Sequence, residues 1–449
     1  MNQWKFFDIF VIGLMMFSIF FGAGNLIFPP ALGQEAGHNL LPAMAGFLLT
    51  GVGLPLLGIV AIALQGGHYT EFISEKVHPK FAMALLSILY LTIGPLFAVP
   101  RTGAVSFEIG IRPFLSEEYM ELGQAVYTGI FFLCTYYLAL NPSKLVERVG
   151  KILTPVLLAF LGILFFRAFG SPLGDILDAT GHYAIAPFAQ GFQDGYLTMD
   201  LLASLAVGSL VVNAIRMKGV SDNLKISRLC ILCGILAVSL MAVIYGSLSY
   251  IGATSASVLG HSPNGGVLLA DAARLFFGTS GGLILAVIIA FACLTTSCGM
   301  VSACAWFFSN ATKNGIAYHR IVLFSSIFAF VFSNVGLTQL ISISVPFLVA
   351  IYPNIIVLVI LSLFARWIGE RKAVYRCAIA FTLPFCLMDG LNAAGIQIQE
   401  INYLLSQYIP FFGIMLGWFV PALTGTVIGA VISCFQKVSA PPAIRMKDL

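Results

Sequence analysis

The chain has 449 residues, of which 59% are hydrophobic and 9% are charged, and its formal net charge is +4. Soluble domains carry about 25% charged residues, so this composition excludes a soluble globular protein and indicates an all-α polytopic membrane protein. No GxxxxGK[ST] stretch occurs in the sequence, which argues against a nucleotide-driven pump. Neither an organic cofactor, nor a nucleic-acid partner, nor an obligatory protein partner is expected.

Apolar runs between charged or Pro/Gly-rich breaks predict about twelve transmembrane helices. The expected spans are 7–33, 40–64, 81–105, 121–140, 151–169, 187–214, 226–252, 279–309, 321–338, 340–365, 374–391 and 410–435. With the N-terminus in the cytoplasm, all Lys and Arg residues fall on the cytoplasmic side except Arg101, Arg112, Arg167 and Arg274. We therefore expect the N- and C-termini in the cytoplasm and the longest polar stretches, 106–120, 170–186 and 253–278, outside.

The first predicted span contains the unusual stretch FFGAGNLIFPP, which begins at Phe20. Gly22 and Gly24 weaken a helix, and Pro29 and Pro30 remove hydrogen-bond donors, so the helix is expected to open here. Opened backbone within the bilayer is tolerated only where protein or a polar cavity covers it. Helix packing through small residues is the alternative interpretation of the glycines.

The sixth predicted span repeats this pattern. It is interrupted by Gly191, Gly195 and Gly208, and it carries Asp200 near its middle, where a carboxylate is costly and usually functional. Two interrupted helices five spans apart are typical of a transporter with an inverted repeat. We expect a first five-helix repeat over 1–170, a second over 171–365, and two further helices with a cytoplasmic tail over 366–449.

The eighth span carries consecutive hydroxyl side chains in the stretch AFACLTTSCGMVSACAW. Thr295, Thr296 and Ser297 follow the Ala292 carbonyl by about one helical turn. Such hydroxyls often bond only to their own helix. Next to opened backbone, hydroxyls and carbonyls can also provide the oxygen ligands of a small cation.

Several stretches resemble the branched-chain amino acid:cation symporter family (LIVCS, BrnQ-type): FFGAGNLIFPPALGQEAG, GPLFAVPRTGAVSFE, NPSKLVERVGKILTP, GYLTMDLLASLAVG and PNIIVLVIL. The resemblance covers about residues 7–435. It implies a LeuT-type fold of the APC superfamily, with a five-plus-five inverted repeat and discontinuous helices 1 and 6. It also implies a secondary active transporter, and no enzyme, in the bacterial cytoplasmic (inner) membrane.

The activity that the resemblance implies is import of leucine, isoleucine and valine by cation symport through alternating access. Na⁺ is the expected coupling ion. H⁺ coupling and another small neutral amino acid as substrate are the alternatives. A channel is disfavoured because few charges lie within the spans, and a membrane enzyme because the histidines lie in loops or at span ends.

The resemblance also implies site residues. The Ala23 and Gly24 amides would bind the substrate carboxylate, and Gly22 would allow close approach. The full expected substrate site is Gly22, Ala23, Gly24, Asn25, Tyr196, Thr198, Asp200 and Ala203. The expected Na⁺ ligands are Ser18, Phe21, Ala292, Thr295 and Thr296, with Ser297 if the register shifts by one residue. A possible second Na⁺ site consists of Phe20, Asn25 and Thr198.

Three polar residues remain without a firm role. Asp200 stands where relatives usually have a small polar residue, and it could receive the substrate ammonium, carry a coupling proton or brace the opened segment. Arg101 is expected near the outer face, where it reaches the lipid headgroups or pairs with an acidic residue. Asp389 and Asn392 are expected near the surface and in contact with solvent.

Overall fold

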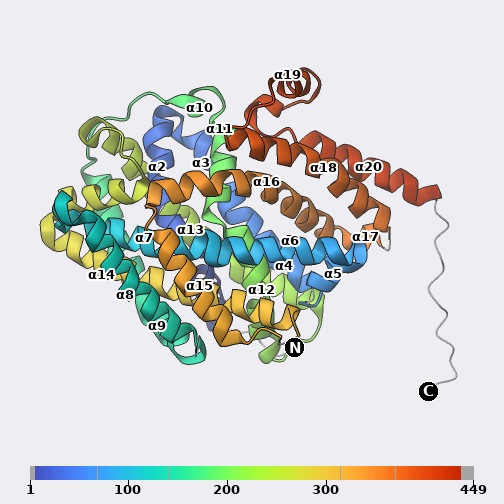
Figure 1. The fold of residues 1–449 in the computed structure, drawn as a ribbon, viewed down its shortest axis with the longest axis horizontal. Helices are drawn as coiled ribbons and strands as arrows, with labels where there is room; N and C mark the ends of the chain where they lie inside the picture. The colour runs from blue at the N-terminus through green and yellow to red at the C-terminus, as the bar shows by residue number, and fades with distance from the viewer. Residues whose placement is uncertain (1–5, 68, 141, 314, 370, 436–449) are drawn as a thin grey trace.

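The computed structural model describes residues 6–67, 69–140, 142–313, 315–369 and 371–435, without the side chains of residues 6, 18, 19 and 142–154. The described residues form helices and connecting segments, with no strand among them (Figure 1). This confirms the all-α prediction. Eight of the described helices are long and apolar enough to span a membrane, and four shorter apolar helices accompany them. The expected count of about twelve spans stays a prediction.

The first part of the chain contains α1 (Phe6–Phe20), α2 (Ala23–Ala36), α3 (Leu40–Leu48), α4 (Leu54–Leu64), α5 (Tyr69–Lys76), α6 (Pro79–Leu91), α7 (Ala98–Gly110), α8 (Met120–Ala139) and α9 (Pro142–Gly170). The next part contains α10 (Gly181–Ile185), α11 (Pro187–Asp194), α12 (Asp200–Met217), α13 (Asn223–Leu259), α14 (Gly265–Ala311), α15 (Tyr318–Ser333) and α16 (Leu337–Leu363). The last helices are α17 (Ala365–Ile368), α18 (Lys372–Ala393), α19 (Gln399–Tyr408) and α20 (Phe419–Phe435).

The expected separation of the ninth and tenth spans is confirmed, because Gly336 stands between α15 and α16 with φ of 101°. The span boundaries expected on either side of the polar stretch 253–278 are wrong, whereas its external position stays a prediction. In the structure α13 continues to Leu259, and α14 begins at Gly265 after the Asn264 side chain, which accepts hydrogen bonds from Gly266 and Val267. Gly278, with φ of 66°, kinks α14 without ending it.

Helix α2 lies deep in the bundle because glycines of two neighbours allow its backbone to approach. A Cβ added at Gly252 of α13 would lie 2.0 Å from the Pro30 carbonyl oxygen, and one at Gly265 of α14 would lie 1.7 Å from the Ile27 carbonyl oxygen. Any side chain at either position would therefore push α2 away. These close contacts hold α2, the second half of the opened first span, against α13 and α14.

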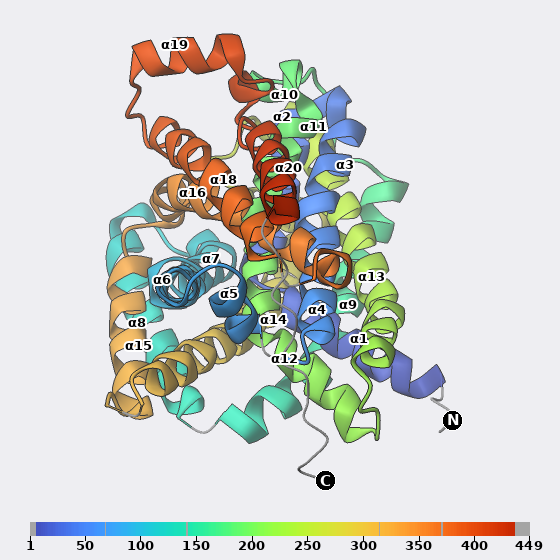
Figure 2. The ribbon, with the colours of Figure 1, turned by 90° about the vertical axis from the view of Figure 1, so that its right-hand side faces the viewer.

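The two broken spans cross the middle of the molecule. In Figures 1 and 2, α10 and α19 lie at one end of the bundle, while the start of α1 lies toward the opposite end. Helices α18 and α20 pack on each other, and α18 also packs on α16. The last helices therefore cover one side of the bundle that holds both breaks.

Candidate functional site

The first break lies between α1 and α2, at Phe21 and Gly22. Gly22 is extended (φ −129°, ψ −168°), and its N–H donates to Asn25 Oδ1 at 3.0 Å. The first turn of α2 therefore starts at Ala23 and presents N–H groups that no preceding turn can satisfy. Pro29 and Pro30 do not lie at the break, because α2 continues through them. The prediction of a break in this stretch is confirmed. The helix opens at Gly22, and the two prolines do not contribute to the opening.

The second break lies between α11 and α12. A short 3₁₀ turn (Gly195–Thr198) is followed by Met199 in the left-handed conformation, with φ of 61°, and α12 then begins at Asp200. A left-handed residue that is not glycine costs about 1–2 kcal/mol, so surrounding contacts must hold it. Of the glycines expected to interrupt this span, only Gly195 lies at the break. Gly191 and Gly208 lie inside α11 and α12.

A hydrogen-bonded triad connects the two breaks. Asn25 Nδ2 donates to Asp200 Oδ2 at 2.7 Å and also bonds the Tyr245 hydroxyl. Tyr245, on α13, donates to the same Asp200 oxygen at 3.1 Å. All three side chains are buried, with Asp200 only 2% exposed. The triad holds the start of α12 against the start of α2, and Tyr245 is a member that sequence reasoning missed.

A small cavity lies where the two breaks meet. Its volume is about 30 Å³, which is room for about two water molecules. Most of the predicted substrate-site residues line it: Gly22, Ala23, Gly24, Asn25, Thr198, Asp200 and Ala203. The structure therefore brings this set together at one place, although their roles in binding stay predictions. An amino acid fits only if the surrounding helices move apart.

Tyr196 is the predicted substrate residue that does not line the cavity. It is 1% exposed, stacks on Tyr352 of α16 with ring centroids 4.5 Å apart, and meets Phe192 edge-on. Tyr196 thus packs the second break against α16.

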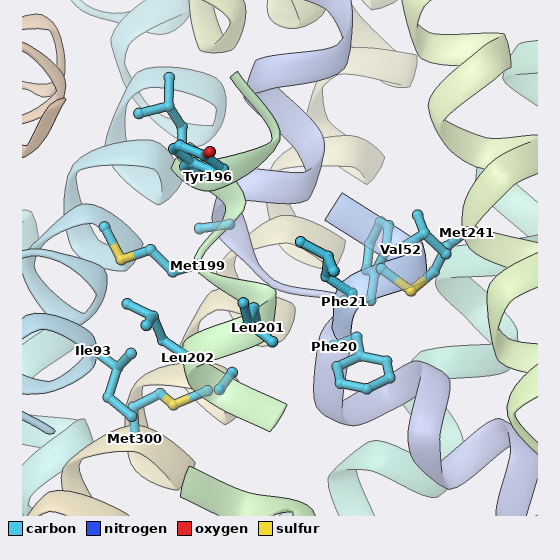
Figure 3. Close-up of a cluster of buried hydrophobic side chains, with 14 of the residues drawn as sticks. Phe20, Phe21, Val52, Ile93, Tyr196, Met199, Leu201, Leu202, Met241 and Met300 are labelled. Atoms are coloured by element: carbon cyan, nitrogen blue, oxygen red, sulfur yellow. The ribbon is translucent and has the colours of Figure 1, made fainter. Parts of the chain in front are cut away.

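Side chains that were not predicted line other parts of the cavity wall. They include Ile93, Met199 and Met300, and Ala98 and Thr102 of α7. Figure 3 shows Ile93 and Met300 beside Leu202, and Phe20 and Phe21 across the first turn of α12 from them. In the sequence, an apolar residue that lines a cavity looks the same as one that packs between helices.

Arg101 also lines the cavity, and the expectation that it lies near the outer face is wrong. Its side chain is 3% exposed, and its guanidinium carbon lies 5.0 Å from the centroid of the Phe28 ring. The span that carries it extends from Pro79 to Phe114 and includes a wider π-helical turn at Thr92–Leu96. Position 101 therefore falls within the span and not at its end.

The hydroxyls of α14 do not all point the same way. Thr295 and Thr296 both donate to the Ala292 carbonyl, at 2.8 and 3.0 Å. Thr296 lines the cavity, and its Cγ2 would lie 3.2 Å from a Cβ added at Gly22. Ser297 instead pairs with Thr135 of α8 at 3.1 Å.

The remaining expected ion ligands lie in or beside the first break. Phe20 lines the cavity, while Phe21 is buried next to it without lining it. The Ser18 side chain lies outside the described residues, although its backbone belongs to α1. Of the expected ion ligands outside the substrate set, only Phe20 and Thr296 line the cavity within the described part of the chain, and their role in ion binding stays a prediction.

Asp389 is buried, so the expectation that it contacts solvent is wrong. It is 1% exposed on α18, and neither carboxyl oxygen has a hydrogen-bond partner among the residues that the structure describes. Helices α16 and α20 pack on α18 and cover this residue. The sequence of one span by itself does not reveal such burial. Asn392, one turn later, is partly exposed and pairs with Asn402.

Comparison with known proteins gives the family. Residues 5–436 match the family described as "Branched-chain amino acid transport protein". The chain belongs to this family. The transporter is 44% identical over 428 residues to the branched-chain amino acid permease BraB of Bacillus subtilis, covering 95% of this chain and 96% of that protein. It is 42% identical over 445 residues to the branched-chain amino acid transport system 2 carrier protein of Pseudomonas aeruginosa, covering 98% and 99%.

Solved structures show which fold the transporter has. Mhp1, a nucleobase-cation-symport-1 family transporter in a closed conformation with bromovinylhydantoin bound, aligns with a TM-score of 0.63 at 12% identity and covers 95% of this chain and 92% of Mhp1. MhsT in complex with L-phenylalanine aligns with a TM-score of 0.54 at 15% identity, covering 96% and 100%. The predicted LeuT-like fold is confirmed at this level, whereas the inverted repeat stays a prediction. Membership in a family of transport proteins also confirms that the chain is no enzyme.

Proposed function

We propose that the protein imports leucine, isoleucine and valine into the cytoplasm by symport with Na⁺. The observation that carries this proposal is the cavity at the meeting point of two broken spans, lined by opened α2 backbone and by the Asp200 carboxyl. Broken helices at mid-depth present backbone to substrates and ions in secondary transporters. The names of the relatives, which are branched-chain amino acid permeases and carriers, support the substrate class.

Asp200 is the proposed partner of the substrate ammonium. The side-chain hydrogen bonds from Asn25 and from Tyr245 both go to Oδ2. Asp200 also lines the cavity, and we propose that Oδ1 meets the substrate ammonium there. A cationic partner would offset the cost of keeping a carboxylate buried at this depth. The Ala23 and Gly24 amides are the proposed donors to the carboxylate at the other end of the substrate.

The apolar wall suits a branched aliphatic side chain. Ile93, Met199, Ala203 and Met300 offer only hydrocarbon and thioether surface. Methionine side chains adapt their shape easily, and apolar pockets distinguish one methylene by only about 1–3 kcal/mol. We therefore propose that one site accepts all three branched-chain amino acids with modest preference.

We place the coupling Na⁺ between the first break and α14, with the Ser18, Phe21 and Ala292 carbonyls and the Thr295 and Thr296 hydroxyls as ligands. Contact between Thr296 and Gly22 supports this placement, since an ion there would connect α14 to the opened segment.

A second ion at Phe20, Asn25 and Thr198 is less favoured. Asn25 Oδ1 already accepts from Gly22 N–H, and the Thr198 hydroxyl donates to the Gly195 carbonyl. We therefore propose that a single Na⁺ is coupled. It would stabilise the open cavity until substrate binds and the helices close again.

The test is uptake of labelled leucine into proteoliposomes that contain the purified protein, with Na⁺ and H⁺ gradients imposed separately. The proposal predicts accumulation that follows an inward Na⁺ gradient and is inhibited by unlabelled isoleucine and valine. Accumulation driven only by a proton gradient would replace Na⁺ with H⁺, with Asp200 as the candidate proton carrier. Absence of gradient-driven uptake of all three amino acids would contradict the function.

A further inference from the structure

Arg101 is the one basic side chain among the residues that line the cavity, and no direct ion pair within the described residues compensates its charge, although the Asp200 carboxyl lines the same cavity. Arg101 is 3% exposed, and an arginine side chain stays protonated in proteins. Its Nη1 atom has no hydrogen-bond partner, and it forms no ion pair within the described part of the chain. The contact with the Phe28 ring, 5.0 Å away, provides only partial compensation.

The guanidinium of Arg101 lies beside the N-terminus of α2. A Cβ added at Gly24 would lie 3.1 Å from Arg101 Nη2, so the guanidinium packs directly against the backbone of the first turn of α2. The N-terminus of a helix carries partial positive charge from its unsatisfied N–H groups. Two groups of the same sign therefore lie side by side in a buried place, an arrangement that an anion would stabilise.

We propose that Arg101 binds the carboxylate of the transported amino acid together with the first-turn amides of α2. This inference rests on the proposed function, because it takes an α-amino acid as the substrate. Guanidinium groups bind carboxylates through two parallel N–H···O bonds, and a buried charged pair of this kind contributes strongly to recognition. With Asp200 in the same cavity, one acidic and one basic side chain match the two charges of a zwitterion.

The experiment measures competition against labelled leucine with leucine and with leucinamide, which keeps the ammonium and the side chain but lacks the negative charge. In the wild type, leucine should compete at least about 30-fold better than leucinamide, as expected for a buried charged partner. In Arg101→Gln the affinity for leucine should fall at least about 30-fold while that for leucinamide changes less than about threefold. An equal loss for both ligands would overturn the proposal and leave Arg101 a structural role.

The matched control is Arg167→Gln on α9. Arg167 also places its guanidinium over an aromatic ring, with its carbon 5.9 Å from the Phe276 centroid, but it is exposed and outside the cavity. Its variant should keep the wild-type preference for leucine. If Arg101→Gln is not recovered as a monodisperse protein, Arg101→Lys decides, because lysine keeps the charge but not the two-pronged geometry. A selective loss of leucine affinity in that variant supports the proposal, and an equal loss for both ligands overturns it.

The same assay separates the two proposals. If wild-type protein binds and transports no branched-chain amino acid, the proposed function fails. If wild-type protein transports leucine but Arg101→Gln still prefers leucine over leucinamide by the wild-type factor, only the role of Arg101 fails.

Discussion

Thr296→Val is the substitution that tests the proposed ion site most sharply. Valine keeps the shape of threonine and replaces Oγ1, which donates to the Ala292 carbonyl at 3.0 Å, by a methyl group. The Thr296 methyl that faces Gly22 is kept, so contact with the first break is preserved. Interactions of a polar group with a charge contribute about 1.5–3 kcal/mol, which corresponds to a factor of about 10–150 in an equilibrium constant. We expect the Na⁺ concentration for half-maximal leucine uptake to rise by about this factor.

The assay is initial leucine uptake into proteoliposomes as a function of external Na⁺, with choline as the replacing cation. At saturating Na⁺ the apparent leucine affinity of Thr296→Val should change less than about threefold, since the hydroxyl is proposed to bind the ion. Thr296→Ser keeps the hydroxyl and should stay near the wild type. Ser297→Ala removes the bond to Thr135 and should lower thermal stability without shifting Na⁺ activation. Na⁺ activation equal to the wild type in Thr296→Val would refute the proposed ion placement. If Ser297→Ala instead raises the Na⁺ concentration for half-maximal uptake, the ion ligand is Ser297 and not Thr296.

Three further predictions concern the second break and the buried acids. Gly195→Ala should destabilise the protein by about 1–3 kcal/mol in a thermal-shift assay, because the new Cβ would lie 1.8 Å from Thr50 Oγ1, and a melting temperature equal to the wild type would contradict this. Asp200→Asn should abolish leucine uptake, while 4-methylpentanoate, which lacks the ammonium, should stabilise the purified variant in a thermal-shift assay no less than it stabilises the wild type. Unchanged leucine uptake would exclude the ammonium contact. Asp389→Asn should leave the melting temperature equal or higher, since both carboxyl oxygens are buried without a partner in the described part of the chain. A large loss of stability in this variant would contradict the expectation.

The two breaks could be predicted because their chemistry is visible in the sequence. Gly22 and Gly195 stand in apolar runs next to Asn25 and Asp200, and hydrocarbon tolerates such residues only where backbone or charge has a covered partner. The structure places the helix ends within a few residues of these positions. The prediction was wrong about the prolines, which were expected to help open the helix, because Pro29 and Pro30 lie inside α2.

The partners of the breaks could not be predicted in the same way. Arg101 reaches the cavity only because its span is long and contains a π-helical turn, which changes both depth and facing direction. Tyr245 was missed because an aromatic residue within an apolar span looks the same whether it packs or donates a hydrogen bond. Asp389 seemed close to a span end, and only the packing of α16, α18 and α20 buries it. Each of these errors concerns contacts between helices distant in sequence.

The central claim is that the amino acid binds where the two broken spans meet. A structure of the protein determined with leucine and Na⁺ bound tests it most directly. The account predicts leucine density in contact with the first turn of α2, with its ammonium within hydrogen-bond distance of Asp200 and its side chain toward Ile93 and Met300. Leucine bound elsewhere, with the Asn25–Asp200 hydrogen bond and the cavity unchanged, would contradict it.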